Sequence, residues 1–184
     1  MRSRDKFLVG GGIASTALLA FGAAWLLDRH PVGNSHVPQP AKAVDLQSYL
    51  GRWYEIARYE QRFERGCVGV TATYSLRPDG KIEVLNRCRK PNGRFSEARG
   101  SAKIVEGSSN AKLKVSFFGP FSGDYWVLDH AEDYSWSIVG EPSGRYLWIL
   151  ARTAYPPIER TEQLIGRARA MGYDTSMLIR TRHP

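Results

Sequence analysis

Short runs of alternating apolar and polar residues, separated by turn residues, occupy most of the chain between residues 51 and 152. The run over residues 68–76 is the clearest, and its alternate positions are apolar: Val68, Val70, Ala72, Tyr74 and Leu76. Strict alternation of this kind is typical of a β-strand with one buried face. Pro78-Asp79-Gly80 then supplies a turn, and residues 82–86 predict a returning strand. We therefore expect a fold built from antiparallel hairpins.

Eight such strands are predicted, joined by short connections. The first begins near Trp53, and the others cover residues 68–76, 82–88, 95–105, 112–118, 124–129, 134–139 and 146–152. Eight antiparallel strands in sequential order can close into a barrel with room for one small ligand. A two-sheet sandwich needs a longer crossing connection, which the pattern does not show. We predict an all-β, up-and-down eight-stranded barrel.

Helical signals flank the strands. Residues 157–171 predict a helix, because Pro157 suits a first turn and Gly172 suits a C-terminal cap. Its apolar face carries Ile158, Ile165, Ala168 and Met171. We expect this face to pack on the outside of the barrel, followed by a short strand over residues 177–179. A short helical turn is also predicted over residues 44–50, before the first strand.

The N-terminal segment differs in composition from the rest. A basic leader precedes residues 7–27, which carry no charge and are long enough to span a bilayer. Residues 1–29 are therefore interpreted as an uncleaved signal-anchor or as a cleaved signal peptide, and both readings stay open. With either one, the positive-inside rule predicts export of everything after residue 30. Residues 30–43 are interpreted as a linker, and residues 44–184 as the barrel domain.

Cysteine usage and charge exclude several classes of function. Cys67 and Cys88 are too far apart for a CxxC redox or zinc pair, and in an oxidising compartment we expect them to form a disulfide. No residue set suggests a metal site or a cofactor. The net charge of +8 is modest once the leader is set aside, and no basic stripe with interleaved aromatic residues suggests nucleic-acid binding.

Several segments resemble the lipocalin family, and specifically a bacterial lipocalin of the kind that resembles apolipoprotein D. Gly51, Trp53 and Tyr54 match the family's Gly-x-Trp-Tyr motif, and Arg152 matches its arginine after the last strand. The second motif, Thr-Asp-Tyr, is only partly present, because Glu132 precedes Asp133 and Tyr134. Further resembling segments cover residues 53–58, 62–65, 70–76, 114–121 and 146–152. The resemblance extends over about residues 44–182.

The motif residues are expected to close one end of the barrel. In a meander, the connections after the second, fourth and sixth strands return to the end where the first strand starts, and the eighth strand also ends there. This places Trp53 beside Arg152, whose guanidinium can stack on the indole ring and bond loop carbonyl groups. We therefore assign a structural role to the motif set: Gly51, Trp53, Tyr54, Asp133, Tyr134 and Arg152.

The opposite end is expected to be the mouth of a ligand pocket. Strand parity points five apolar or aromatic side chains inward as ligand contacts: Tyr74, Val84, Phe117, Tyr125 and Trp148. Five basic residues lie around the mouth: Arg62, Arg65, Arg87, Arg89 and Lys90. Of these, Arg62, Arg65 and Arg89 are selected as contacts for a phosphate or carboxylate headgroup. The disulfide would hold the same rim.

The resemblance implies a non-enzymatic function: reversible binding, storage or transport of a fatty acid or lysophospholipid that helps maintain the bacterial envelope membrane. A barrel-based enzyme such as an isomerase is one alternative, with Glu55 and Tyr125 as the groups to test. A tetrapyrrole-binding barrel is another, and a barrel filled by its own side chains would indicate a scaffold.

The leader also bears on the localisation of the protein. Bacterial lipoproteins of this branch carry a lipid-attachment Cys after the apolar leader, whereas no Cys precedes Cys67 here. We therefore expect a periplasmic protein, anchored in the inner membrane by residues 7–27 or released by cleavage, rather than an outer-membrane lipoprotein. The oligomeric state and the identity of the ligand are open.

Overall fold

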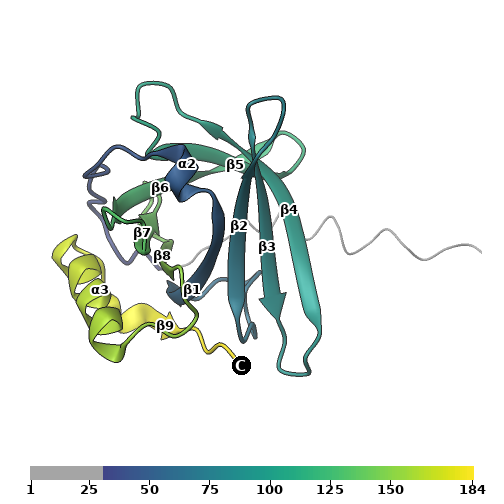
Figure 1. Ribbon diagram of the computed structural model, residues 1–184. Coiled ribbons are helices and arrows are strands. Elements are labelled where there is room, and N and C mark those ends of the chain that lie inside the picture. Colours follow the sequence, from purple (N-terminus) through teal and green to yellow (C-terminus); the bar gives the residue numbers. More distant parts are fainter. Residues whose placement is uncertain (1–30) are drawn as a thin grey trace, which may run out of the picture.

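The computed structural model describes residues 31–184, and the predicted signal or anchor lies outside the described residues. The described chain forms one antiparallel barrel with a helix on its outside (Figure 1). Its elements are α2 (Leu46–Tyr49), β1 (Gly51–Tyr59), β2 (Val70–Leu76), β3 (Ile82–Arg89), β4 (Phe95–Ile104), β5 (Lys112–Phe118), β6 (Phe121–His130), β7 (Trp136–Gly140), β8 (Leu147–Ala151), α3 (Ile158–Ala170), the 3-10 turn η1 (Thr175–Met177) and β9 (Leu178–Arg180).

Strand β1 closes the barrel by pairing on both sides. Its first half pairs with β2, so that Trp53 lies opposite Ala72, and it pairs with β8 through Tyr54 opposite Ala151. Every other neighbour in the barrel is also the next strand along the chain. The prediction of an eight-stranded antiparallel barrel is therefore confirmed. Strand β9 adds a ninth ribbon outside the closure, beside the second half of β1.

Strand boundaries differ from the predicted ones mainly near the mouth. The second strand was predicted over residues 68–76, but β2 begins at Val70, so Cys67 lies in the preceding loop and not next to the strand. The segment 119–123 was predicted as a loop, but β6 already begins at Phe121 and only Gly119 and Pro120 form the turn. The apolar Phe121 therefore belongs to a strand end at the rim.

Two layers of apolar side chains stabilise the structure. One lies inside the barrel and includes Trp53, Val84 and Val127, and the other lies between the outer barrel wall and α3. The buried face of α3 consists of Thr161, Leu164, Ile165 and Ala168. Ile158 was expected on this face but is 56% exposed, because it is the first residue of the helix. Arg167 secures the helix through an ion pair of 3.0 Å with Asp129 of β6.

Residues 31–43, predicted to belong to a linker, lie along the outer wall of the barrel as an arm. At the start of the arm, the amides of Gly33 and Asn34 donate to the carbonyl of Gly144, at 2.9 and 3.2 Å. Gly144 adopts a φ of +67°, and a Cβ there would lie 1.8 Å from the carbonyl oxygen of Asn34, so only glycine fits. Further along, Ala41 donates to the carbonyl of Leu128. The arm is thus part of the fold.

Within residues 31–184, no helix is both long enough and apolar enough to cross a bilayer.

Candidate functional site

One end of the barrel is closed by Trp53 and Arg152. The guanidinium carbon of Arg152 lies 3.8 Å from the centre of an indole ring of Trp53. The guanidinium donates to four carbonyl groups, those of Ser48, Leu50, Arg52 and Tyr134, over distances of 2.6–3.3 Å. The indole N–H of Trp53 donates to the carbonyl of Tyr49 at 2.9 Å. This end is therefore sealed by bonds between α2, β1 and the β6–β7 turn.

The remaining motif residues surround this seal. Gly51 begins β1 with a φ of +93°, and a Cβ there would lie 3.5 Å from Arg152 Nη1. Tyr134 supplies one of the four carbonyls, and its hydroxyl accepts a bond from the amide of Asp45. The Asp133 carboxylate accepts from the amide of Ser135 and stabilises the β6–β7 turn. Tyr54 packs instead toward the outside, edge-on to His183.

A chain of hydroxyl groups forms the floor above the seal. Tyr74 donates to Tyr125 at 2.9 Å, and the Tyr125 and Tyr49 hydroxyls lie 3.0 Å apart. Tyr49 continues the chain to Ser137 Oγ at 3.1 Å. Burial raises the pKa of Tyr49 to about 12, and burial likewise raises the pKa values of Tyr74 and Tyr125. The floor is therefore uncharged at neutral pH.

A cavity of two connected compartments lies between this floor and the mouth. The inner compartment has a volume of about 80 Å³ and the outer one about 160 Å³. Both are lined by Phe63, Glu64, Val70, Asn86, Val115 and Phe117. The outer compartment opens where β4 diverges from β5, because these strands pair only over residues 101–104 of β4. Its rim includes Phe118 and Phe121.

All five side chains expected to point inward line the inner compartment: Tyr74, Val84, Phe117, Tyr125 and Trp148. Strand alternation found them because each lies on the buried face of its strand. Polar groups that the sequence analysis did not select also line the cavity. Among them, Asn86 Oδ1 is buried with no hydrogen-bond partner.

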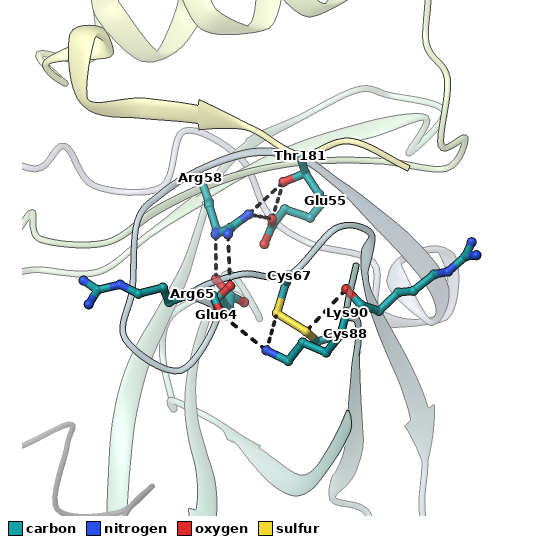
Figure 2. Close-up of a disulfide and its surroundings, with 9 residues drawn as sticks. Glu55, Arg58, Glu64, Arg65, Cys67, Cys88, Lys90 and Thr181 are labelled. Carbon is teal, nitrogen blue, oxygen red and sulfur yellow. Dashed lines mark hydrogen bonds and ion pairs between the residues drawn. A yellow bond between two sulfur atoms is a disulfide. The ribbon is translucent and has the colours of Figure 1, made fainter. Parts of the chain in front are cut away.

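The largest departure from the predicted apolar lining is a buried ionic cluster. Arg58 Nη1 donates to Glu55 Oε1 at 2.8 Å, and Arg58 Nη2 donates to the carbonyl of Glu64 at 3.1 Å (Figure 2). Arg58 Nε lies 3.4 Å from Glu64 Oε2. Thr181, next to β9, also donates to Glu55. The three charged side chains are each at least nine-tenths buried, and both carboxyl groups line the inner compartment.

The cluster contains one cationic side chain, Arg58, and two carboxyl groups. Burial raises the pKa of Glu64 well above its usual value, and the charge of Glu55 raises it further, while Arg58 acts in the opposite direction. Burial also raises the pKa of Glu55, against the effect of Arg58. A single guanidinium can offset only one carboxylate, so burial favours the neutral form of a carboxyl group in this cluster, and the upward shift of the pKa is the stronger one for Glu64.

The predicted disulfide is present and joins the loop before β2 to the end of β3. Cys67 and Cys88 are bonded, with Cα atoms 5.4 Å apart. Lys90 reaches back across the bond, and its Nζ donates to the carbonyl of Arg65 at 3.2 Å (Figure 2). The loop 60–69 is thus fixed over the mouth from two sides, by the disulfide and by Arg58.

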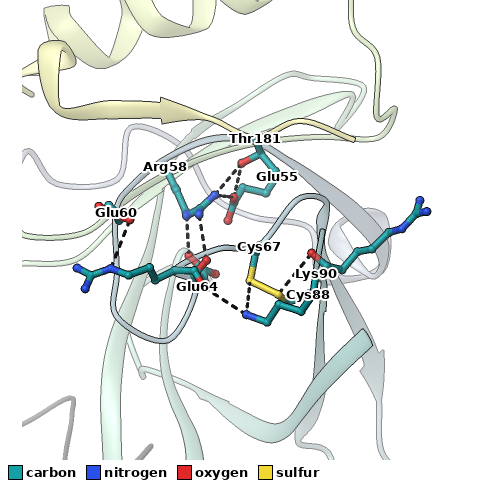
Figure 3. A network of polar contacts seen from close by, with 10 residues as sticks. Glu55, Arg58, Glu60, Glu64, Cys67, Cys88, Lys90 and Thr181 are labelled. Carbon is teal, nitrogen blue, oxygen red and sulfur yellow. Dashed lines mark hydrogen bonds and ion pairs between the residues drawn. A yellow bond between two sulfur atoms is a disulfide. The ribbon is translucent and has the colours of Figure 1, made fainter. Parts of the chain in front are cut away.

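The three arginines selected for a headgroup are placed around the mouth but do not line the cavity wall. Arg65 is 3.6 Å from Glu60 in an exposed ion pair (Figure 3). Arg89 Nη1 donates to the carbonyl of Pro184 at 3.4 Å. Arg62 lies in the same loop as Arg65 and has an interaction partner. The basic residue that lines the outer compartment is Arg87, paired with Glu97 at 2.8 Å.

Among the described residues, no group of His, Cys, Asp and Glu side chains is arranged to hold a metal ion. A barrel sealed at one end, with an apolar cavity reaching the other, defines the class of small-ligand-binding barrels.

Comparison with known proteins identifies the family. A family model described as a lipocalin-like domain matches residues 44–183. The chain belongs to the lipocalin family. It is 46% identical over 145 residues to the outer membrane lipoprotein Blc of Vibrio cholerae, covering 77% of this chain and 84% of that protein. It is 38% identical over 138 residues to apolipoprotein D of Rattus norvegicus, covering 70% and 71%. The resemblance seen in the sequence is therefore confirmed.

Solved structures agree with the fold. Insecticyanin from the tobacco hornworm Manduca sexta superposes with a TM-score of 0.64 at 20% identity, covering 81% of this chain and 87% of that one. At 20% identity, this similarity shows only that the two proteins share the barrel fold.

Proposed function

We propose that this protein reversibly binds a single-chain amphiphile, a fatty acid or a lysophospholipid, for storage or transport in the bacterial cell envelope. The observation that carries the proposal is the apolar, aromatic-lined cavity that reaches the mouth and ends on the uncharged tyrosine floor. An acyl chain fits such a lining because it needs no polar partner along its length. The envelope location is supported by the outer membrane lipoprotein relative.

The expected affinity follows from the transfer of methylene groups out of water. An acyl chain that buries about fourteen methylenes gains roughly 11 kcal/mol, and association costs at least about 4 kcal/mol. At most ~7 kcal/mol remains, which corresponds to a dissociation constant of roughly 10 µM or weaker. Binding in this range is reversible, as a carrier requires.

Polar groups at the cavity wall favour a ligand with a hydroxyl group or a headgroup near the mouth. Asn86 Oδ1 can accept a hydrogen bond from the glycerol hydroxyl of a lysophospholipid, and it borders both compartments. Arg87 lies at the outer compartment, with Arg62, Arg65 and Arg89 farther around the rim as candidates for a phosphate or carboxylate. The raised pKa of Glu64 favours its neutral form, which places no negative charge against the acyl chain.

The test is a titration of the protein with a fluorescent fatty acid and a fluorescent lysophospholipid, supported by native mass spectrometry of the purified protein. Ala72→Phe fills the inner compartment and should lower affinity at least about tenfold, since it displaces several methylenes at ~0.8 kcal/mol each. Thr73→Phe is the matched control, because the next residue on β2 faces outward, and it should bind as the unmodified protein does. If neither the fatty acid nor the lysophospholipid binds, the proposal is contradicted.

The same measurements separate the alternatives. A visible absorbance band in the purified protein would indicate a tetrapyrrole ligand. Turnover of a bound lipid that is lost in Glu55→Gln or Tyr125→Phe would indicate an enzyme.

The mode of membrane attachment is a separate part of the proposal. We propose that residues 7–27 either anchor the chain in the inner membrane or are removed with a signal peptide, with the barrel in the periplasm. The missing lipid-attachment Cys supports this reading, although the relative from Vibrio cholerae is named an outer membrane lipoprotein. N-terminal sequencing and the intact mass of the mature protein distinguish an uncleaved anchor from a cleaved signal peptide. A lipid-modified N-terminus would contradict both forms of this proposal.

A further inference from the structure

The mouth of the barrel carries exposed aromatic side chains that nothing in the described chain covers. Phe95, the first residue of β4, is 57% exposed, and Phe121, the first residue of β6, is 53% exposed. They flank the outer compartment, because Ser96 on one side and Phe121 on the other line it. These two aromatic side chains, at the ends of β4 and β6 on either side of β5, form an apolar rim where a ligand must enter.

Positive charge accompanies the aromatic residues on the same part of the rim. The segment 87–94 contains Arg87, Arg89, Lys90 and Arg94, of which Arg87 is paired with Glu97 of β4 at 2.8 Å. The guanidinium of Arg87 lies 4.7 Å from the ring centre of Phe95, so a cation and an apolar ring occupy one spot. Aromatic rings next to basic side chains suit the interface of an anionic bilayer, where the rings enter the headgroup layer and the cations meet phosphates.

The path of the N-terminal arm points to the same end. Gly33 and Asn34 are bonded to Gly144 in the β7–β8 turn, and this turn lies at the mouth, like the β1–β2, β3–β4 and β5–β6 connections. The arm then runs to the closed end, where the amide of Val44 donates to the carbonyl of Ser109. The described chain therefore begins near the open end of the barrel, and the uncharged run over residues 7–27 precedes this point in the sequence. Val32, 45% exposed, is among the first described residues at that point.

From these three observations we propose that the barrel docks mouth-first on an anionic lipid bilayer, through Phe95, Phe121 and the basic segment 87–94. The outer compartment then opens directly onto the lipid surface, and an amphiphile can pass between bilayer and cavity without crossing water. The docking does not depend on which ligand the cavity holds.

A depth measurement on the full-length chain in vesicles tests the proposal. The vesicles contain phosphatidylethanolamine and phosphatidylglycerol, with a small fraction of spin-labelled lipid as quencher. A fluorophore is attached in turn at Phe95→Cys, Phe121→Cys and Leu76→Cys, with the Cys67–Cys88 bond verified by mass. Leu76 is the matched control, because it is 52% exposed at the last residue of β2, at the closed end.

Quenching at positions 95 and 121 but not at 76 is the expected result. Raising the salt from about 0.1 M to about 1 M should reduce the quenching, because the Debye length falls from about 10 Å to about 3 Å. Equal quenching at all three positions, quenching at 76 alone, or no association with the vesicles overturns the proposal. Protection of the position-95 label from aqueous iodide without lipid, together with a dimeric mass by light scattering, would assign the rim to a second copy instead and also overturns it.

Discussion

The guanidinium of Arg152 lies 3.8 Å above the indole ring of Trp53, although the two residues are almost a hundred positions apart in the chain. The contact joins the first barrel strand to the end of the last. It therefore depends on complete closure of the barrel, and it reports on closure more directly than any contact between neighbouring strands.

Arg152→Lys should destabilise the protein even though it keeps the charge. A lysine has no planar fork, so the stacking on Trp53 and most of the four carbonyl contacts are lost. We expect a decrease of about 2 kcal/mol in the free energy of unfolding, measured by urea denaturation. The control is Arg65→Lys, whose exposed partner Glu60 accepts either cation, and which should leave stability unchanged within about 0.5 kcal/mol. Equal midpoints for both variants would show that the seal contributes no stability.

Tyr125→Phe should break the hydroxyl chain at its centre. The Tyr74 and Tyr49 hydroxyls would each lose a partner in a buried site, at a cost of about 1–3 kcal/mol in the free energy of unfolding. Tyr155→Phe is the control, because its hydroxyl bonds the carbonyl of His183 at an exposed position. A thermal denaturation curve for Tyr125→Phe that matches the control would contradict the assigned role of the chain.

Glu64→Gln should remove a pH dependence of stability that the unmodified protein shows. The pKa of Glu64 is raised in the folded state, so the folded protein binds this proton more tightly than the unfolded chain does. The contribution of Glu64 to the free energy of unfolding is fully present below its pKa in the unfolded chain, about 4.3. This contribution is lost as the pH rises through the pKa of Glu64 in the folded protein. The variant keeps a neutral side chain at every pH and should be the more stable protein on the alkaline side.

The measurement is the free energy of unfolding at a series of pH values from mildly acidic to alkaline. Glu83→Gln serves as the control, because Glu83 pairs with Arg99 at 3.2 Å on the outer face and should leave the slope unchanged. If Glu64→Gln shows the same slope as the unmodified protein, another group holds the proton.

Removing the disulfide should loosen the rim. The bond closes a loop of about 22 residues, which corresponds to roughly 3 kcal/mol in the chain-entropy model. We expect the double variant Cys67→Ser/Cys88→Ser to lose about this amount in denaturant, and the unmodified protein to lose the same amount after reduction. Proteolysis should then cut first within loop 60–69. Cleavage elsewhere at an unchanged rate would show that Arg58 and Lys90 alone hold the loop.

Strand alternation in the sequence predicted the barrel and the inward residues, because period-two burial is a local property. It placed Tyr74 and Trp148 on the correct faces without knowledge of their neighbours. The up-and-down order of the predicted strands brought Trp53 and Arg152 to the same end of the barrel, in agreement with the resemblance to lipocalins, since no local pattern relates residues so far apart. These two sources account for the fold and for the apolar part of the site.

The sequence did not predict the ionic cluster. In the sequence, Arg58 near the end of the first strand and Glu64 in the loop after it look like ordinary surface residues. They are buried because loop 60–69 folds over the mouth and Thr181 arrives from the C-terminal segment. The contacts of the arm over residues 31–43 could not be predicted for a similar reason. Its proline-rich, polar composition carries no period, and its bonds are to Gly144 and Leu128, far along the chain.

Strand β1 changes partners halfway along its length, from β2 at residues 51–54 to β9 at residues 57–59. Where it leaves β2, its main-chain groups would form an open sheet edge, and the C-terminal ribbon occupies that edge. The last residues of the chain therefore protect the barrel against self-association, because an uncovered edge strand is a template for aggregation. Loss of this ribbon would threaten solubility before it affected the cavity.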